Sequence, residues 1–304
     1  MTPSIQLKQR TRKAKRTMNI RLNPRYFGIF PLALFAAMPF LTALANPSAV
    51  ETAKSVSRPS PGPTPTPTTY SGHIVYTASG TLHIFNLANS SDTSLGVSGS
   101  SPKFSLDGSK IVYQNRGIWI INSAGPYSPQ QLSATGGVPS FDPTGTQIAY
   151  TDYGIWRMNA DGSNKTHLTL TGQQPSYSRD GSQIAYNDAV GSSQQLFLIN
   201  SDGTGARQVL TSGAVIDTVW SPGPKVVMGV LSGRRNYQLS TFDPNAPGSL
   251  TTLLTSSATN YEPSWSPDDS HISWTASGGI WIMNADGSNQ RLVISGGRQG
   301  SWGP

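Results

Sequence analysis

Residues 262–289 read EPSWSPDDSHISWTASGGIWIMNADGSN, and this stretch decides the fold because the chain repeats it. Residues 138–164, VPSFDPTGTQIAYTDYGIWRMNADGSN, follow the same plan. More divergent copies contain SPKFSLDGSKIVYQNRGIWIIN, QPSYSRDGSQIAYNDAVGSSQQLFLIN and DTVWSPGPKVVMGV. The aromatic residue that ends the leading Pro-Ser-aromatic element recurs about 40 residues apart, at Phe104, Phe141, Tyr177, Trp220, Trp265 and Trp302.

Each repeat divides into four short strands separated by turns that contain Gly or Asp. In the copy quoted first, the strands are PSWS, ISW, GIWIMN and the segment after NADGSN. Apolar and polar residues alternate within these runs, as in strands, and helical periodicity is absent. A lone four-stranded sheet cannot bury both faces, so such repeats stack around a ring as blades. The sequence predicts an all-β fold, a β-propeller of four-stranded antiparallel blades.

The two ends of the repeat region predict the number of blades. Residues 72–87 supply a second and a third strand but no first strand, and residues 298–304, RQGSWGP, supply a first strand alone. Pairing of the N- and C-terminal strands would complete one blade and remove the free edges of the array. We therefore expect six blades over residues 71–304.

The N-terminal region has the composition of an export signal and a linker. Eight of the 22 Lys and Arg residues precede residue 46, with no acidic residue among them, so the net charge of +7 belongs to this region and does not indicate nucleic-acid binding. An uncharged stretch over residues 27–45 ends in Ala-Leu-Ala. We predict a signal peptide over 1–45, with Met1 or Met18 as the true start and an uncleaved membrane anchor as the alternative. Residues 46–70 are rich in Pro and Thr and predict a disordered linker.

The repeats resemble the WD-like β-propeller repeats of the TolB family, on the evidence of PSWSPDD…ISWTASGGIWIMNADGSN and its second copy. They are also similar to the propellers of dipeptidyl-peptidase and prolyl-oligopeptidase enzymes. The resemblance covers about residues 70–304 and implies the propeller fold. The TolB family places an α/β domain before the propeller, whereas this chain has a Pro-Thr linker there. The repeated residues are structural, so the resemblance implies little about function.

The repeated hexapeptide NADGSN, at 159–164 and 284–289, is either a metal-binding loop or a turn. A calcium loop of the EF-hand type needs Gly at its sixth position and a carboxylate at its twelfth. Counted from Asn159, those positions hold Asn164 and Leu170. Asp-Gly between two strands is typical of a tight hairpin, so we predict turns.

Alternation of strand direction places the stereotyped turns on one face of the propeller and the variable loops on the other. Variable loops on a rigid scaffold commonly carry recognition, so we expect the site on the loop face. The residues that begin the innermost strands should ring the channel mouth there, namely Ser101, Val138, Gln174, Asp217, Glu262 and Gln299. Asp217 and Glu262 could hold a cation or a basic group of a partner, or could be solvated without a function.

We expect an exported, non-enzymatic binding scaffold in the periplasm or outside the cell, with a protein or cell-envelope component as partner. No catalytic residue, metal ligand or cofactor is predicted, since the chain has no cysteine and no Gly-x-Ser-x-Gly motif. The alternatives are a propeller that binds or cleaves a polysaccharide and a scaffold without a ligand of its own. We expect a monomer that contacts a membrane only through an uncleaved N-terminal segment. The candidate partner-binding residues are Arg234, Arg235, Tyr237, Asp217, Tyr261, Glu262 and Arg298.

Overall fold

The computed structural model describes residues 70–210, 214–221, 223–232, 236–246, 248–256 and 261–304. The predicted signal peptide and nearly all of the predicted linker lie outside these residues. In the part of the chain that is described, no helix is long and apolar enough to cross a membrane.

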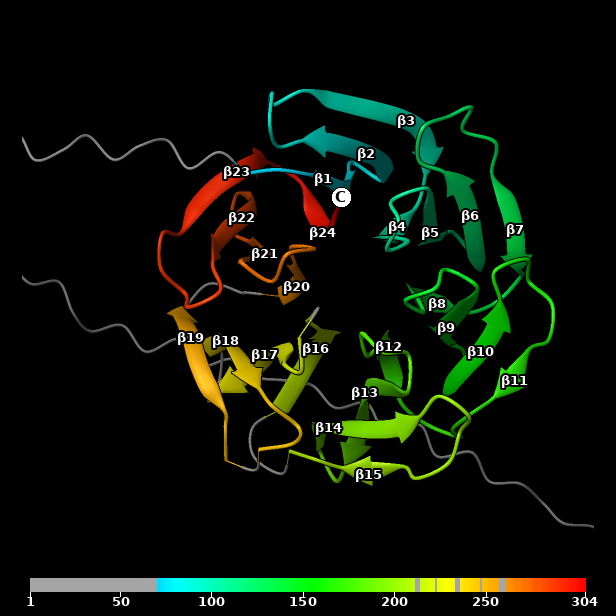
Figure 1. The fold of residues 1–304 in the computed structure, drawn as a ribbon, viewed down its shortest axis with the longest axis vertical. Helices are drawn as coiled ribbons and strands as arrows, with labels where there is room; N and C mark the ends of the chain where they lie inside the picture. Colours follow the sequence, from blue (N-terminus) through cyan, green and yellow to red (C-terminus); the bar gives the residue numbers. More distant parts are fainter. Residues whose placement is uncertain (1–69, 211–213, 222, 233–235, 247, 257–260) are drawn as a thin grey trace, which may run out of the picture. The chain divides into compact units, whose positions relative to one another are not determined.

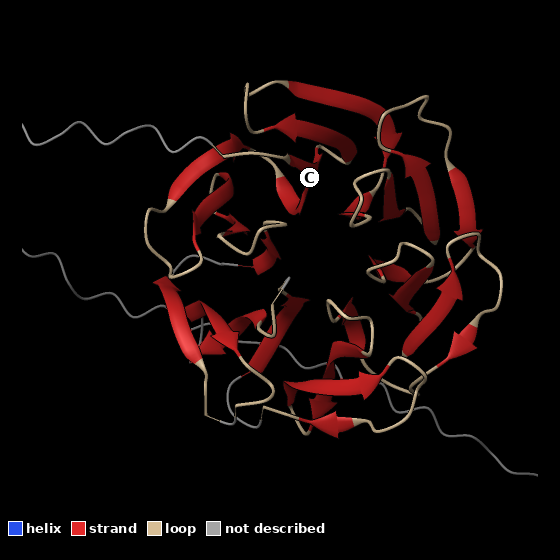
Figure 2. Cartoon of the chain, viewed as in Figure 1, coloured by secondary structure: helices blue, strands red, loops and turns tan. Residues whose placement is uncertain are grey.

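The described strands form six four-stranded antiparallel sheets, arranged as blades in a ring (Figures 1 and 2). This architecture confirms the predicted propeller. Blade 1 contains β24 (Arg298–Gly303), β1 (His73–Ala78), β2 (Thr81–Asn86) and β3 (Asp92–Ser98). Blade 2 contains β4 (Ser100–Phe104), β5 (Lys110–Gln114), β6 (Ile118–Asn122) and β7 (Gln130–Ser133). Blade 3 contains β8 (Gly137–Phe141), β9 (Gln147–Thr151), β10 (Ile155–Asn159) and β11 (Thr166–His167).

The other three blades follow in chain order around the ring. Blade 4 contains β12 (Gln173–Tyr177), β13 (Gln183–Val190), β14 (Ser193–Asn200) and β15 (Arg207–Gln208). Blade 5 contains β16 (Ala214–Trp220), β17 (Val226–Ser232), β18 (Asn236–Phe242) and β19 (Thr251–Ser256). Blade 6 contains β20 (Tyr261–Trp265), β21 (His271–Ala276), β22 (Gly279–Asn284) and β23 (Arg291–Ser295).

Blade 1 is closed by both ends of the repeat region. The last strand, β24, pairs antiparallel with β1, with Trp302 opposite Ile74 and Ser301 opposite Val75. Tyr70, at the end of the predicted linker, is also buried in this blade. Its ring lies 6.0 Å from Trp302 and 4.8 Å from His271, in edge-on contacts. Packed structure therefore begins by residue 70.

The hydrophobic core lies between neighbouring blades. One cluster joins Val75 and Leu82 of blade 1 to Ile111 and Tyr113 of blade 2. Each of these side chains is at least 95% buried. Burial of this kind is the main stabilising contribution, and it requires each blade to have a neighbour on both sides.

The serine of the repeated Pro-Ser-aromatic element links one blade to the next. The inner strands pair on one edge only, which leaves backbone N–H groups at the ring centre without a strand partner. Ser176 Oγ accepts a hydrogen bond from the Trp220 N–H, and Ser264 Oγ accepts one from the Trp302 N–H, both at 3.1 Å. These bonds explain why a small hydroxyl residue precedes the aromatic residue in repeat after repeat.

We predict that Ser264→Ala destabilises the propeller by about 1–3 kcal/mol, since the buried Trp302 N–H would lose its acceptor. Urea denaturation followed by tryptophan fluorescence measures this change. Ser277→Ala, in an exposed turn of the same blade, is the matched control and should cost less than about 0.5 kcal/mol. Equal losses for the two variants would contradict the proposed link.

Candidate functional site

The six residues predicted to ring the channel mouth line a single cavity. Its volume is about 230 Å³. Besides Ser101, Val138, Gln174, Asp217, Glu262 and Gln299, its walls include Lys103 and small polar side chains of the inner strands. Each inner strand changes register at the start of its pairing, and five of the six ring residues have φ between 48° and 59°. These bulges place the ring residues at the cavity wall.

Side chains of the ring also join neighbouring blades. Asp217 Oδ2 accepts a hydrogen bond from the Glu262 N–H at 3.0 Å, and Glu262 Oε2 accepts one from the Gln299 N–H at 3.0 Å. Gln299 Oε1 in turn accepts the Ser101 N–H at 3.0 Å. The two carboxylates thus have a structural role, because each satisfies a backbone donor of the following blade.

Ser101 and Val138 are too short to accept a backbone N–H of the following blade, and other side chains of their blades make this contact instead. Gln114 Oε1 accepts the Val138 N–H at 3.2 Å, and Thr151 Oγ1 accepts the Gln174 N–H at 3.0 Å. Gln174 Nε2 instead donates to Asp217 Oδ1, so Asp217 accepts hydrogen bonds from two blades.

Lys103 is a functional candidate that the sequence reasoning missed. It occupies the position in β4 directly before the repeated aromatic residue, where most other inner strands carry serine (Ser140, Ser176, Ser264 and Ser301) and β16 carries Val219. The available signal was therefore SPKF in place of PSF. Among the described residues, Lys103 Nζ donates no hydrogen bond, and no carboxylate oxygen lies within 4.0 Å of it. The cavity therefore contains one ammonium and two carboxylates that are not in direct contact.

Burial changes the acidity of all three groups. It raises the pKa of Asp217 to about 6, although the Glu262 N–H, Lys103 and Gln174 act in the opposite direction. Burial likewise raises the pKa of Glu262, against hydrogen bonds from Thr275 and Gln299. Burial lowers the pKa of Lys103, and the charges of Glu262 and Asp217 oppose that change. Charged groups with shifted pKa values in a cavity mark it as a candidate functional site.

The other predicted partner-binding residues are placed only in part. Tyr261 begins β20 and is half-buried, and Arg298 begins β24 and is exposed. Each therefore lies next to a ring residue. Tyr237 lies in β18, opposite Leu231 and Ser256. Its side chain, and all of Arg234 and Arg235, lie outside the described part of the chain.

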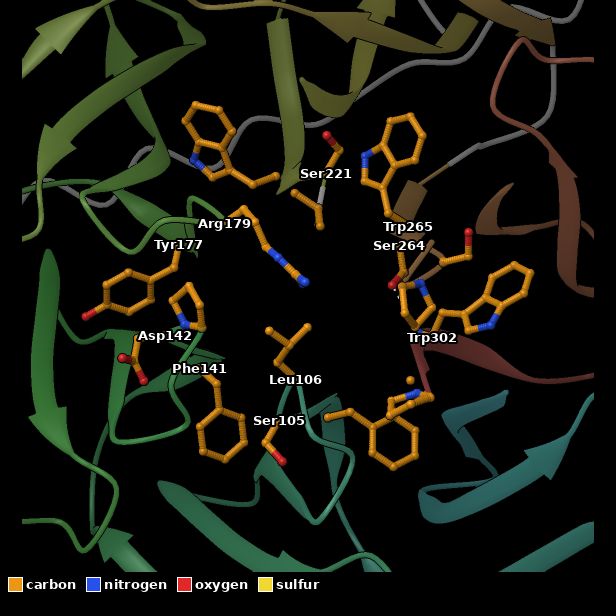
Figure 3. A pocket seen from close by; sticks show the side chains of 18 of the residues that line it. Ser105, Leu106, Phe141, Asp142, Tyr177, Arg179, Ser221, Ser264, Trp265 and Trp302 are labelled. Atoms are coloured by element: carbon orange, nitrogen blue, oxygen red, sulfur yellow. Dashed lines mark hydrogen bonds between the residues drawn. The ribbon is translucent and has the colours of Figure 1, made fainter. Parts of the chain in front are cut away.

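A second cavity, of about 160 Å³, lies among the aromatic residues that end the inner strands. The six repeated aromatic residues line it, together with Leu106 and the exposed Arg179, whose side chain points toward the middle (Figure 3). Leu106 and Arg179 occupy the turn position at which other repeats carry Pro143 or Pro267. Trp220, Trp265 and Trp302 are each at least 91% buried. Most of the surface of these rings therefore belongs to the core.

The NADGSN segments form turns, as predicted. In the first copy, Asp161 Oδ1 accepts hydrogen bonds from the Ser163 N–H at 2.9 Å and the Ser163 hydroxyl at 2.6 Å. Asp286 and Ser288 repeat both bonds in the second copy. The serine hydroxyl and then its N–H lower the pKa of each aspartate. The polar atoms of the hexapeptide thus bond to one another.

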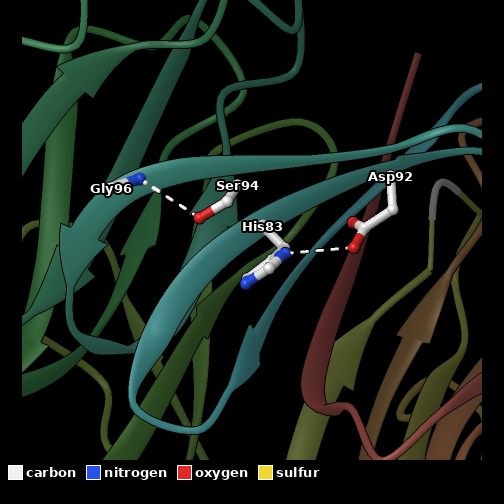
Figure 4. A network of polar contacts seen from close by, with 4 residues as sticks. All are labelled: His83, Asp92, Ser94 and Gly96. Atoms are coloured by element: carbon white, nitrogen blue, oxygen red, sulfur yellow. Dashed lines mark hydrogen bonds and ion pairs between the residues drawn. The ribbon is translucent and has the colours of Figure 1, made fainter.

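His83 is the strongest candidate for polar chemistry away from the cavities. Its Nδ1 lies 3.1 Å from Asp92 Oδ2, and on the neighbouring strand the Gly96 N–H donates separately to Ser94 Oγ (Figure 4). Its ring lies 5.3 Å from the Tyr76 ring, at the position where other repeats carry tryptophan. Among the described residues, no three His, Asp or Glu side chains form a group suited to a metal ion. His83 therefore packs as an aromatic residue that is held by one carboxylate.

Comparison with known proteins relates the fold to one family. Residues 85–304 match the family described as TolB beta propeller domain. TolB from Acinetobacter baumannii superposes with a TM-score of 0.67 at 21% identity, over 78% of this chain and 67% of that chain. A putative TolB from Agrobacterium tumefaciens gives a TM-score of 0.65 at 16% identity, over 76% and 92% of the two chains.

Some structural neighbours are enzymes. Oligogalacturonate lyase from Vibrio parahaemolyticus superposes with a TM-score of 0.51 at 14% identity, over 70% of this chain and 74% of that chain. A similarity at this level of identity shows a shared fold and does not transfer an activity.

We predict that protonation of Asp217 adds to the stability of the propeller as the pH falls from 7.5 toward 5. The folded-state pKa of Asp217, about 6, lies above the ordinary value of an aspartate, so the folded state binds this proton more tightly than the unfolded state does. Between pH 7.5 and 5 the contribution is about 1–1.5 kcal/mol, because the folded state takes up the proton as the pH falls through about 6. Urea denaturation at both pH values measures it. Asp217→Asn, which keeps a carbonyl oxygen for the Glu262 N–H, should remove this part of the pH dependence. Identical pH profiles for the two proteins would contradict the assignment.

Proposed function

Because the chain belongs to the TolB β-propeller family, we propose that it is an exported, non-enzymatic scaffold that binds a protein or a cell-envelope component through its variable-loop face. The observation that carries this proposal is the cavity of Asp217, Glu262 and Lys103 at the loop end of the inner strands. Charged groups in a partly closed cavity attract a partner of complementary charge and orient it.

The residues around this cavity give the proposed surface its chemistry. Tyr261 and the exposed Arg298 lie beside the ring residues Glu262 and Gln299. Tyrosine and arginine are the side chains that most often anchor a protein partner. The proposed site thus combines anchoring side chains at the rim with a charged centre, where a basic group of the partner would approach the two carboxylates.

Export and location are part of the proposal. They rest on the basic segment, the uncharged stretch and the Ala-Leu-Ala ending within residues 1–45. A Pro-Thr linker after them would hold the propeller away from the membrane if the segment is retained as an anchor. Mass spectrometry of the protein from an envelope fraction distinguishes cleavage from retention.

A polysaccharide-cleaving function has less support than the binding scaffold. Glycoside hydrolysis uses a pair of carboxyl groups that are free to act on the substrate. Here Asp217 and Glu262 both accept backbone N–H groups of the following blade. The cavity lining contains no histidine that could serve as a general base. A glycan array together with a reducing-end release assay tests this alternative directly.

We predict that a photo-crosslinking amino acid at Ser277, in an exposed loop of the variable face, captures the partner in intact envelopes. The same amino acid at Asn289, in a turn of the opposite face, is the matched control. Mass spectrometry of the crosslinked products identifies the partner. Equal products at both positions, or products at Asn289 alone, would contradict binding through the loop face.

Glu262→Gln should weaken this capture at least about tenfold if the carboxylate contacts a basic group of the partner. The substitution keeps an oxygen for the Gln299 N–H, so the melting temperature should change little. Glu262→Ala is unsuitable because it would remove a link between blades as well as a charge. Arg298→Ala tests the rim of the cavity in the same assay.

A further inference from the structure

Tyr153 occupies a backbone conformation that is unfavourable for its side chain. It lies in the loop between β9 and β10 with a φ of 50°. The corresponding loops carry Gly278 in blade 6, with a φ of 92°, Gly80 in blade 1, with a φ of 82°, and Arg116 in blade 2, with a φ of 49°. Positive φ is rare for a bulky residue, and glycine adopts it without strain.

Packing within the propeller does not offset this strain. The Tyr153 side chain is 94% exposed. An exposed aromatic ring on a strained backbone gives the folded chain no stability, and local strain of this kind concentrates at functional sites. The position therefore indicates a contact with another molecule.

Leu170 lies beside Tyr153 and is 83% exposed. The Ile155 N–H donates to Thr169 Oγ1 at 2.9 Å, and the Leu168 N–H donates to the Ile155 carbonyl oxygen at 2.8 Å. These bonds hold the segment before Leu170 against the Tyr153 loop. A Cβ at Gly154 would lie 3.0 Å from the carbonyl carbon of Leu170. The two most exposed large hydrophobic side chains among the described residues are thus neighbours.

Blade 4, the next blade in the ring (Figure 1), contributes a further exposed apolar side chain. Thr171, which follows Leu170, donates its hydroxyl hydrogen to Asp188 Oδ2 at 2.6 Å. Val190, two residues after Asp188, is 45% exposed. We call Tyr153, Leu170 and Val190 the blade 3–4 patch. It lies on the variable-loop face, and none of its members is a candidate that the sequence suggested.

Two carboxylates accompany the blade 3–4 patch. Asp152 precedes Tyr153 and accepts a hydrogen bond from the Thr135 hydroxyl at 2.7 Å, and Asp188 accepts the one from Thr171. Both side chains are half-exposed, and each threonine hydroxyl bonds to one oxygen. The second oxygen of Asp188 accepts the Ala189 N–H at 2.7 Å, and both half-exposed carboxylates keep lone pairs for a further donor beside the apolar surface. A Lys or Arg side chain of a partner would find both charge and an aromatic ring there.

We propose that the blade 3–4 patch docks a protein segment in which an apolar side chain lies next to Lys or Arg. The apolar side chain packs between Tyr153 and Leu170, and the basic group pairs with Asp152 or Asp188. This inference rests on the proposed function and assigns it to blades 3 and 4, whereas the charged groups of the cavity, Lys103, Asp217 and Glu262, come from blades 2, 5 and 6. The carboxylates disfavour an anionic lipid surface, which their charge would repel.

A random peptide library displayed on phage, selected on the full-length protein, tests this proposal. We expect enrichment of sequences that pair an aromatic or aliphatic residue with Lys or Arg. Synthetic versions of the enriched peptides should bind Tyr153→Gly and Leu170→Ser at least about tenfold more weakly than the unchanged protein. Asp188→Asn should weaken binding by a smaller factor that decreases as salt is added.

The Tyr153→Gly variant distinguishes a docking role from a structural one. Glycine fits the positive φ, so the melting temperature should stay within about 3 °C of the unchanged protein while peptide binding is lost. Leu292→Ser removes an exposed leucine on the outer strand of blade 6. It should leave the melting temperature and peptide binding unchanged. A large fall in the melting temperature of Tyr153→Gly would assign the residue to the fold and overturn the proposal.

The remaining outcomes separate this inference from the proposed function. Enriched peptides that lose binding in Glu262→Gln, and not in Tyr153→Gly, would overturn the blade 3–4 patch and support the charged cavity. Absence of any enriched peptide would overturn the patch, and crosslinking at Ser277 would still test the loop face. Tyr153-dependent binding to vesicles of phosphatidylethanolamine and phosphatidylglycerol, or to a glycan array, would replace the protein segment as the occupant.

Discussion

Pairing of β24 with β1 is the interaction on which the other parts of the structure depend. A four-stranded blade buries its faces only against neighbours, so an open row of blades would leave apolar surface exposed at both ends. With Trp302 opposite Ile74, the ring is complete and every blade has two neighbours. Closure also aligns the six inner strands around one axis, where residues near their N-terminal ends share a cavity.

The fold could be predicted because each repeat shows the same order of strands and turns, so several copies support one interpretation. The placement of Ser101, Glu262 and Gln299 around one cavity follows from the same alignment, because equivalent positions in a ring lie at equivalent depths. The sequence could not show that Asp217 and Glu262 accept backbone N–H groups of the next blade. Such contacts depend on the distance between blades, which periodicity does not encode. Their role in binding stays a prediction.

Departures from the repeat carry more functional information than the repeat itself. Lys103 replaces a serine that joins blades, Tyr153 replaces a glycine in a strained loop, and Arg179 replaces a proline at the aromatic cavity. Sequence reasoning favoured Arg234 and Arg235 as residues that could anchor a partner, and these two lie outside the described residues. It passed over Tyr153 because exposure and φ are visible only in a structure.

The hydrogen bonds at the ring centre run from each inner strand to the next, from Ser176 to Trp220 and from Asp217 to Glu262. A blade that opens would therefore leave unpaired donors in its neighbour as well as losing its own contacts. Linear repeat arrays can unfold one unit at a time because each unit ends in a free surface. In this ring, opening any blade removes support from two others, so the propeller should lose its structure in a single cooperative transition.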